Sequence, residues 1–156
     1  MTTPLRNDEQ RLTKREEFTV SSAAMADVPW AVAGAAGAVV TGADLLFHLI
    51  GGHLAPSASF SAGTVAAFTV AGGSVVIRRN SSRAARWARS HPWRFAVVPG
   101  AATAAIVFVL AVIGSSGVFG GIFTALWHGA ITFGLTGAAG AIAGSGKRSD
   151  KRRTSY

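Results

Sequence analysis

Four long apolar runs, separated by polar or charged segments, set the pattern of hydrophobic and polar positions along this chain. Each run has roughly 18 to 27 residues, and about 20 apolar residues are enough for an α-helix to cross the hydrocarbon core of a bilayer. The pattern therefore predicts an all-α membrane protein with four transmembrane helices. The predicted helices cover about residues 29–50, 60–77, 95–113 and 118–144.

The charged residues lie in three blocks that frame these runs, and their placement predicts an orientation. All 15 lysine and arginine residues fall in the blocks, whereas the connections at 51–59 and 114–117 carry none. Because the cytoplasmic loops of membrane proteins carry the excess of basic residues, we expect two helical hairpins with both termini in the cytoplasm. The expected domains are a cytoplasmic N-terminal arm at 1–28, a transmembrane domain at 29–145 with an arginine-rich cytoplasmic loop at 78–94, and a basic cytoplasmic tail at 146–156.

The N-terminal arm carries both signs of charge and shows almost no apolar periodicity. Such a composition is typical of a solvated and partly disordered segment, which is the state expected for residues 1–28. The alternative is a short helix that is capped by Thr3 and has Pro4 in its first position. A cleaved signal peptide is not expected, because the leading segment is long and balanced in charge.

Asp44 is the only carboxylate within the apolar runs, and His128 lies near the middle of the last run. A charged aspartate at mid-bilayer costs about 2.5–3.5 kcal/mol on insertion scales, so Asp44 needs a partner. With the expected topology, the helix rise places Asp44 roughly 9 Å and His128 roughly 15 Å from the outer surface. We therefore predict that Asp44 and His128 form an intramembrane polar pair, directly or through a water molecule. The expected supporting residues are Thr41, His48, Thr124 and Thr132.

Four interpretations of this pair stay open. It is a structural lock between the first and last helices, or a step in a proton or ion pathway, because histidine titrates near neutral pH. Together with His48 and His53, it is a set of ligands for a transition metal. In the fourth interpretation the residues are unrelated. The spacing of Asp44 and His48 is too weak a signal to predict a metal site, so neither a metal nor a cofactor is expected.

Small residues are expected to form the helix-packing faces, because they let two backbones approach closely in lipid. In the first run, Gly37 shares a face with Thr41 and Asp44, and we expect this face to match the small, polar face of the last run. The glycines expected at helix contacts are Gly37, Gly120, Gly121, Gly140 and Gly144.

The loop at 78–94 has six arginines, two tryptophans and no acidic residue. Ser82 is expected to cap a short helix that lies along the membrane, with Trp87 at the level of the lipid headgroups. The residues expected to set the topology and to contact anionic headgroups are Arg78, Arg79, Arg83, Arg86, Trp87, Arg89 and Arg94. The alternative partner is nucleic acid, with arginine on the phosphates and tryptophan stacked on bases.

Several enzyme classes are disfavoured by the sequence. The chain has no cysteine, so thiol catalysis and thiolate metal sites are excluded. Residues 114–117 have the Gly-x-Ser-Gly form found in rhomboid proteases, but Ser116 would lie roughly 18 Å from His128 along a continuous helix. A nucleophile and its base must lie within about 3 Å of each other. No phosphate-binding loop or dinucleotide fingerprint is present, so we expect no enzyme.

In layout alone, the chain is similar to the small hydrophobic spread proteins of actinomycete conjugative plasmids and to phage holins. The abundance of alanine, glycine, valine and arginine is also typical of a high-GC bacterium. The function we expect is a non-catalytic accessory or assembly protein of the plasma membrane, which forms a homo-oligomer or joins a larger membrane complex. The alternatives are a small proton- or metal-coupled transporter that uses Asp44 and His128, and a plasmid-spread or holin-like protein.

Overall fold

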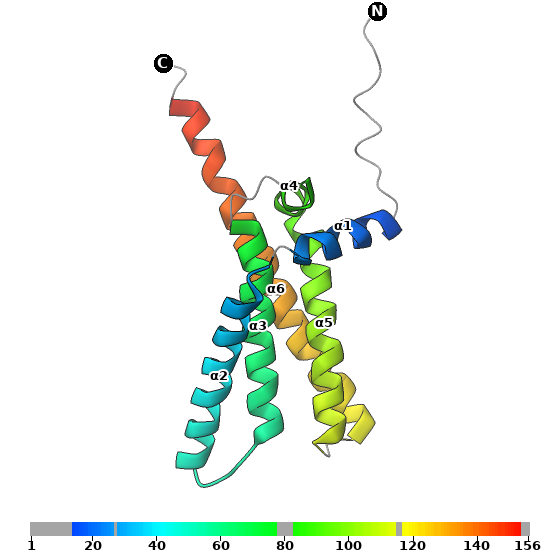
Figure 1. The fold of residues 1–156 in the computed structure, drawn as a ribbon, viewed down its shortest axis with the longest axis vertical. Helices are drawn as coiled ribbons and strands as arrows, with labels where there is room; N and C mark the ends of the chain where they lie inside the picture. Colours follow the sequence, from blue (N-terminus) through cyan, green and yellow to red (C-terminus); the bar gives the residue numbers. More distant parts are fainter. Residues whose placement is uncertain (1–13, 27, 78–82, 115–116, 154–156) are drawn as a thin grey trace, which may run out of the picture.

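The computed structural model describes residues 14–26, 28–77, 83–114 and 117–153, which are helical apart from short connections (Figure 1). The helices are α1 (Lys14–Ala26), α2 (Trp30–Ile50), α3 (Pro56–Ile77), α4 (Arg83–Ser90), α5 (Pro92–Ile113) and α6 (Gly117–Arg153). No strand occurs in these ranges, which confirms the predicted all-α class. Four helices are long and apolar enough to cross a membrane, namely α2, α3, α5 and the part of α6 from Gly117 to Ala143.

Two of these four helices begin earlier than predicted. Helix α3 starts at Pro56 instead of about residue 60, and α5 starts at Pro92 instead of about residue 95. Proline suits the first position of a helix, because its fixed φ angle is helical and its missing N–H would have no partner there. The proline- and serine-rich second half of the connection expected at 51–59 is therefore the first turn of α3, which places Ser59 on a helix.

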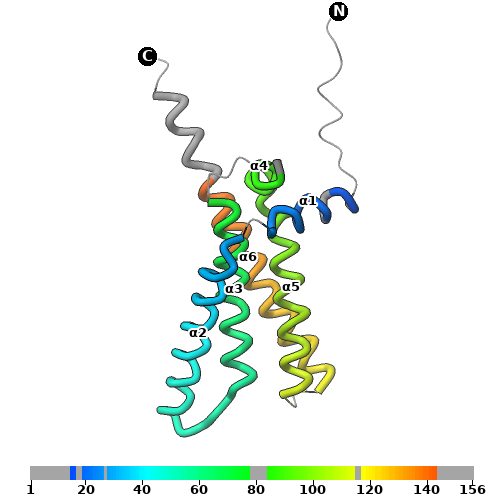
Figure 2. Tube along the Cα trace, viewed as in Figure 1, coloured from blue at the N-terminus to red at the C-terminus, as the bar shows by residue number. Residues whose placement is uncertain are grey.

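Helix α3 is the centre of the packing, because it contacts α2 as well as α5 and α6. Helices α5 and α6 pack against each other more extensively than any other pair in the described chain. Figure 2 shows α2 beside α3 at the edge of the bundle, and α3 is the only described helix that α2 contacts. The predicted match between the small face of α2 and that of the last helix is therefore wrong, because this face of α2 packs on α3.

Glycine allows close approach at two helix crossings. A Cβ atom at Gly37 of α2 would lie 2.8 Å from the carbonyl oxygen of Gly63 in α3. At the crossing of α5 and α6, a Cβ atom at Gly129 would lie 2.9 Å from the Cβ atom of Ala104 and 3.0 Å from the carbonyl oxygen of Gly100. Since real Cβ atoms almost never come within 3.0 Å of another heavy atom, both crossings depend on glycine.

The other glycines singled out from the sequence have different surroundings. Gly121 lies against α5, where its Cβ position is 3.1 Å from a methyl group of Val112. Gly140 lies against Pro92 and Val76, so it contacts both α5 and α3. Gly120 is half-buried in α6, and the surroundings of Gly144 lie outside the described part of the chain.

Residues 14–26 form a helix, although a solvated arm was expected over residues 1–28. The second half of α1 is rich in small apolar residues, and Ala24 and Met25 are buried in an apolar cluster with Val28 and Phe95. Helix α1 packs on α4 and on the neighbouring ends of α3 and α5 (Figure 1). Burial of this apolar end accounts for the ordering of a segment whose first half is charged. The alternative helix starting near Thr3 and Pro4 lies outside the described residues.

Candidate functional site

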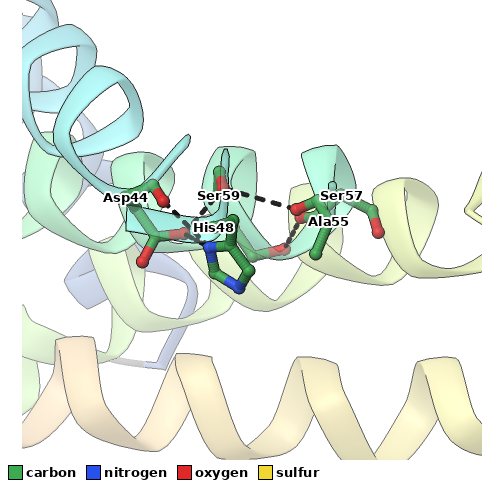
Figure 3. Close-up of polar contacts among 6 residues, drawn as sticks. Asp44, His48, Ala55, Ser57 and Ser59 are labelled. Atoms are coloured by element: carbon green, nitrogen blue, oxygen red, sulfur yellow. Dashed lines mark hydrogen bonds and ion pairs between the residues drawn. The ribbon is translucent and has the colours of Figure 1, made fainter. Parts of the chain in front are cut away.

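The polar residues of α2 meet the start of α3 in a cluster that we call the clamp, formed by Asp44, His48 and Ser59 (Figure 3). The Ser59 hydroxyl donates a hydrogen bond of 2.6 Å to Oδ2 of Asp44. Nδ1 of His48 lies 3.2 Å from the same oxygen. One carboxylate oxygen therefore holds a hydroxyl from α3 and an imidazole from its own helix.

The local helical geometry explains how the clamp is built. Asp44 and His48 are four residues apart, so their side chains share one face of α2. Ser59 is fully buried in the first turn of α3, and its hydroxyl also lies 3.3 Å from the carbonyl oxygen of Ala55. The Asp44 side chain is 34% exposed and that of His48 is 24% exposed, so the carboxylate is only partly desolvated. A charge-assisted bond in this setting ties the end of α2 to α3.

The predicted contact between Asp44 and His128 is not formed. Helices α2 and α6 do not touch within the described chain, and Asp44 is engaged with α3. His128 uses its Nδ1–H to donate to the carbonyl oxygen of Thr124, one turn back on its own helix, at 2.7 Å. The sequence estimate fixed depth along each helix, but depth does not determine which helices are neighbours.

The predicted supporting residues are also divided between different helix pairs. Thr41 faces Gly63, where its hydroxyl occupies the space that a side chain on α3 would need. His48 belongs to the clamp, and Thr124 is half-buried on α6. Thr132 is completely buried on α6, which has no contact with α2. Only Thr41 and His48 therefore share the α2–α3 interface with Asp44.

The arrangement of the clamp is not that of a nucleophilic site. In a serine–histidine–aspartate triad, the serine hydroxyl bonds to imidazole and the imidazole bonds to the carboxylate. Here the Ser59 hydroxyl donates its hydrogen bond directly to Asp44, and His48 approaches Asp44 through Nδ1. Within the described residues, no three histidine, aspartate or glutamate side chains come together as metal ligands. Ser116, the serine of the Gly-x-Ser-Gly sequence, lies outside the described residues.

Ser59 is the member of the clamp that the sequence interpretation missed. It falls in the connection expected at 51–59, where the surrounding glycine, proline and serine residues are typical of a turn. The available signal was Pro56, which favours a helix start and would have placed Ser59 one turn into α3.

A second set of polar residues, which we call the threonine core, lies on the mutually packed helices α3, α5 and α6. Its members are Thr69, Thr103, Thr132 and Thr136, whose buried hydroxyls have no hydrogen-bond partner among the described residues. The packing at Gly72 places Thr136 of α6 beside Pro99 of α5. Burial of a hydroxyl without a hydrogen-bond partner lowers the stability of the fold by about 1–3 kcal/mol. The hydroxyls of the threonine core therefore contribute less to stability than the bonded hydroxyl of the clamp.

The arginine-rich loop contains α4, as the sequence predicted for a short helix. Trp87 packs against the apolar cluster beneath α1 and stacks on the His91 ring, with ring centroids 5.4 Å apart. Helix α1 supplies part of the apolar surface around this half-buried ring, and its expected position at the level of the lipid headgroups stays a prediction. Arg86 and Arg94 are exposed, whereas Arg89 donates from Nε to the carbonyl oxygen of Ala85. The predictions for Arg78, Arg79 and the Arg83 side chain, and the Ser82 cap, lie outside the described part of the chain.

The comparisons with known proteins add no assignment to this geometry. No protein family matches the chain, and no curated protein or solved structure is significantly similar to it.

Proposed function

We propose that this chain is a small multi-pass protein of the plasma membrane with a non-catalytic, accessory or assembly role. It acts as a homo-oligomer or as a subunit of a larger membrane complex. The observation that carries the proposal is the sparse packing of α2, of which only Ala33 and Gly37 are buried. Most of its other residues are exposed and are available to lipid and to other transmembrane helices.

The exposed surface of α2 is suited to contact with another helix. Gly34 and Gly42 have open space around their Cβ positions, and Ala38 lies between them at four-residue spacing. In lipid, small residues at this spacing let two backbones approach and gain van der Waals contact. Large apolar side chains such as Phe47, which is 75% exposed, lie on the same helix and suit the hydrocarbon. Helix α2 is therefore the part of the chain that we assign to association.

The proposed topology has two helical hairpins, α2–α3 and α5–α6, with both termini and residues 78–94 in the cytoplasm. Its support is the distribution of basic residues, since the connections at 51–59 and 114–117 contain none. The exposed Arg86 and Arg94 would then face the anionic headgroups of the inner leaflet.

The non-catalytic role is supported by the bonding within the clamp. Its serine hydroxyl donates to a carboxylate, and its imidazole lies against the same carboxylate, which is a suitable arrangement for joining two helices and differs from a serine–histidine pair. A proton or metal pathway through Asp44 and His128 is not part of this proposal, because those residues lie on helices that do not touch.

Disulfide crosslinking tests the proposed association, because the chain has no natural cysteine. We expect Ala38→Cys to form a disulfide-linked dimer in native membranes. The matched control is Leu135→Cys, an exposed α6 position at a similar distance from the same end of the bundle. Equal crosslinking at both positions would indicate random collision and contradict a specific α2 interface. If neither position reacts, a longer amine-reactive crosslinker is used and the copurified proteins are identified. A crosslinked foreign protein would indicate a larger complex, and its absence would indicate a monomer and contradict the proposal.

A further inference from the structure

The end of α2 is closed by a turn that brings two histidines together. Gly52 has a φ angle of 77°, in the left-handed region that favours glycine. Its N–H donates to the carbonyl oxygen of Leu49, and the N–H of His53 donates to that of His48, each at 3.1 Å. This pair of bonds is the Schellman motif, in which the chain folds back over the last helical turn.

In a Schellman motif the residue after the glycine contacts the residue five positions before it, and this contact is usually apolar. Here both positions are histidine. The rings of His48 and His53 lie with centroids 5.0 Å apart and planes at 81°. The capping geometry thus places two imidazoles side by side at the connection between α2 and α3.

Each imidazole has one nitrogen already engaged with an oxygen acceptor. Nδ1–H of His48 donates to the backbone carbonyl of Asp44 at 2.9 Å and lies 3.2 Å from its carboxylate. Nδ1–H of His53 donates to the carbonyl oxygen of Gly51 at 3.3 Å. A proton on Nδ1 leaves the lone pair on Nε2. Metal-binding histidines have this pattern, in which the second ring nitrogen donates to a carboxylate or a backbone carbonyl.

We propose that His48 and His53 bind one divalent transition-metal ion of the zinc type through their Nε2 atoms. With Zn–N bonds of about 2.0–2.1 Å, two imidazoles on a tetrahedral ion have ring centres roughly 5.2 Å apart. The observed separation of 5.0 Å fits this requirement. No third histidine, aspartate or glutamate among the described residues joins the pair, so water completes the coordination and the ion is exchangeable.

Asp44 is a positioning residue in this site. Its carboxylate lies on the Nδ1 side of His48 and also accepts the bond from Ser59, so it connects the imidazole to α3. Bound metal favours the ring orientation that the clamp holds. Metal binding therefore stabilises the contact between α2 and α3, in addition to the apolar packing of these helices.

Zinc titration of the full chain in detergent micelles, by calorimetry with a tag that lacks histidine, tests the site. We expect one Zn²⁺ per chain in the wild type and at least a tenfold loss of affinity in His53→Ala and in His48→Ala. His91→Ala and His128→Ala are the matched controls, since His91 lies between α4 and α5 and His128 lies on α6, and they should bind as the wild type does. No binding at millimolar Zn²⁺, full affinity in His53→Ala, or an equal loss in the controls would overturn the proposal.

Variants of the clamp and of the turn test whether these contacts build the site, and the thermal midpoint of His53→Ala separates metal binding from folding. Asp44→Asn should weaken Zn²⁺ binding by about tenfold, because removal of an outer-shell carboxylate has effects of 10–100-fold. Gly52→Ala should also weaken binding, since alanine strains the positive φ that brings His53 over His48. His53→Ala should keep the thermal midpoint of the zinc-free wild type and lose the increase that Zn²⁺ produces. Unchanged affinity in both Asp44→Asn and Gly52→Ala would show that the clamp and the turn do not build the site.

Discussion

The clamp and the threonine core both place hydroxyl groups between helices, but they differ in how these groups are satisfied. In the clamp, Ser59 bonds to a carboxylate that is itself partly exposed. In the threonine core, completely buried hydroxyls such as that of Thr132 have no partner among the described residues. Polar residues in a membrane span are thus of two kinds, those that join helices and those that merely fit between them. Mutations at the two regions should have opposite effects on stability.

The largest effect is expected at the glycine crossing on which the clamp depends. In Gly63→Val, the new side chain would overlap the Thr41 hydroxyl and lie 2.7 Å from the carbonyl oxygen of Gly37. Overpacking of this kind costs about 3 kcal/mol or more against backbone, so we expect α2 to separate from α3 and folded yield to fall. Gly134→Val on α6 is the control, because the Cβ position of Gly134 is open. Thermal unfolding in detergent measures both, and equal stability of the two variants would contradict the observed crossing.

The next effect concerns the clamp itself. Ser59→Ala leaves the Asp44 carboxylate without its donor from α3, and loss of a hydrogen bond to a charged group costs about 1.5 kcal/mol at the lower end of the usual range. We expect a double-mutant cycle of Ser59→Ala and Asp44→Asn to show coupling above about 0.5 kcal/mol. In a second cycle, of Asp44→Asn and His128→Ala, the changes in the free energy of unfolding should be additive. Coupling in the second cycle and none in the first would restore the pairing predicted from the sequence.

The replacement of the predicted Asp44–His128 pair by the clamp shows which features of the structure the sequence alone could predict. The four apolar helices were predictable, because hydropathy over about 20 residues is a local property of the chain. The neighbour of α2 was not predictable from depth, since any helix with a polar residue at the same level would have matched Asp44. Ser59 was hidden because proline and serine indicate a turn as readily as a helix start. The contact of His48 with His53 could have been predicted from Gly51 and Gly52, because glycine is typical of a helix C-terminus that folds back on its last turn.

A smaller effect of opposite sign is expected in the threonine core. Thr132→Val removes a buried hydroxyl without a partner and keeps the side-chain shape, so we expect stability to increase by about 1 kcal/mol. Thr64→Val is the comparison, because the Thr64 hydroxyl donates to the carbonyl oxygen of Phe60 at 2.8 Å and should gain nothing. The measurement is the thermal midpoint in the same detergent. Destabilisation by Thr132→Val would mean that this hydroxyl has a partner, and the contrast with the clamp would disappear.

The smallest effect is expected at His128, the residue that the sequence made most prominent. Its imidazole bonds to a carbonyl on its own helix and contacts no carboxylate in the described part of the chain, whereas His48 makes both kinds of contact. A helical carbonyl already accepts its backbone bond, so losing the extra donor leaves no buried group unpaired. His128→Ala should therefore change the free energy of unfolding by no more than about 0.5 kcal/mol, as for substitutions away from specific interactions. A loss comparable to that of Ser59→Ala would place a second polar partner on α6 and make His128 part of a helix-joining contact like the clamp.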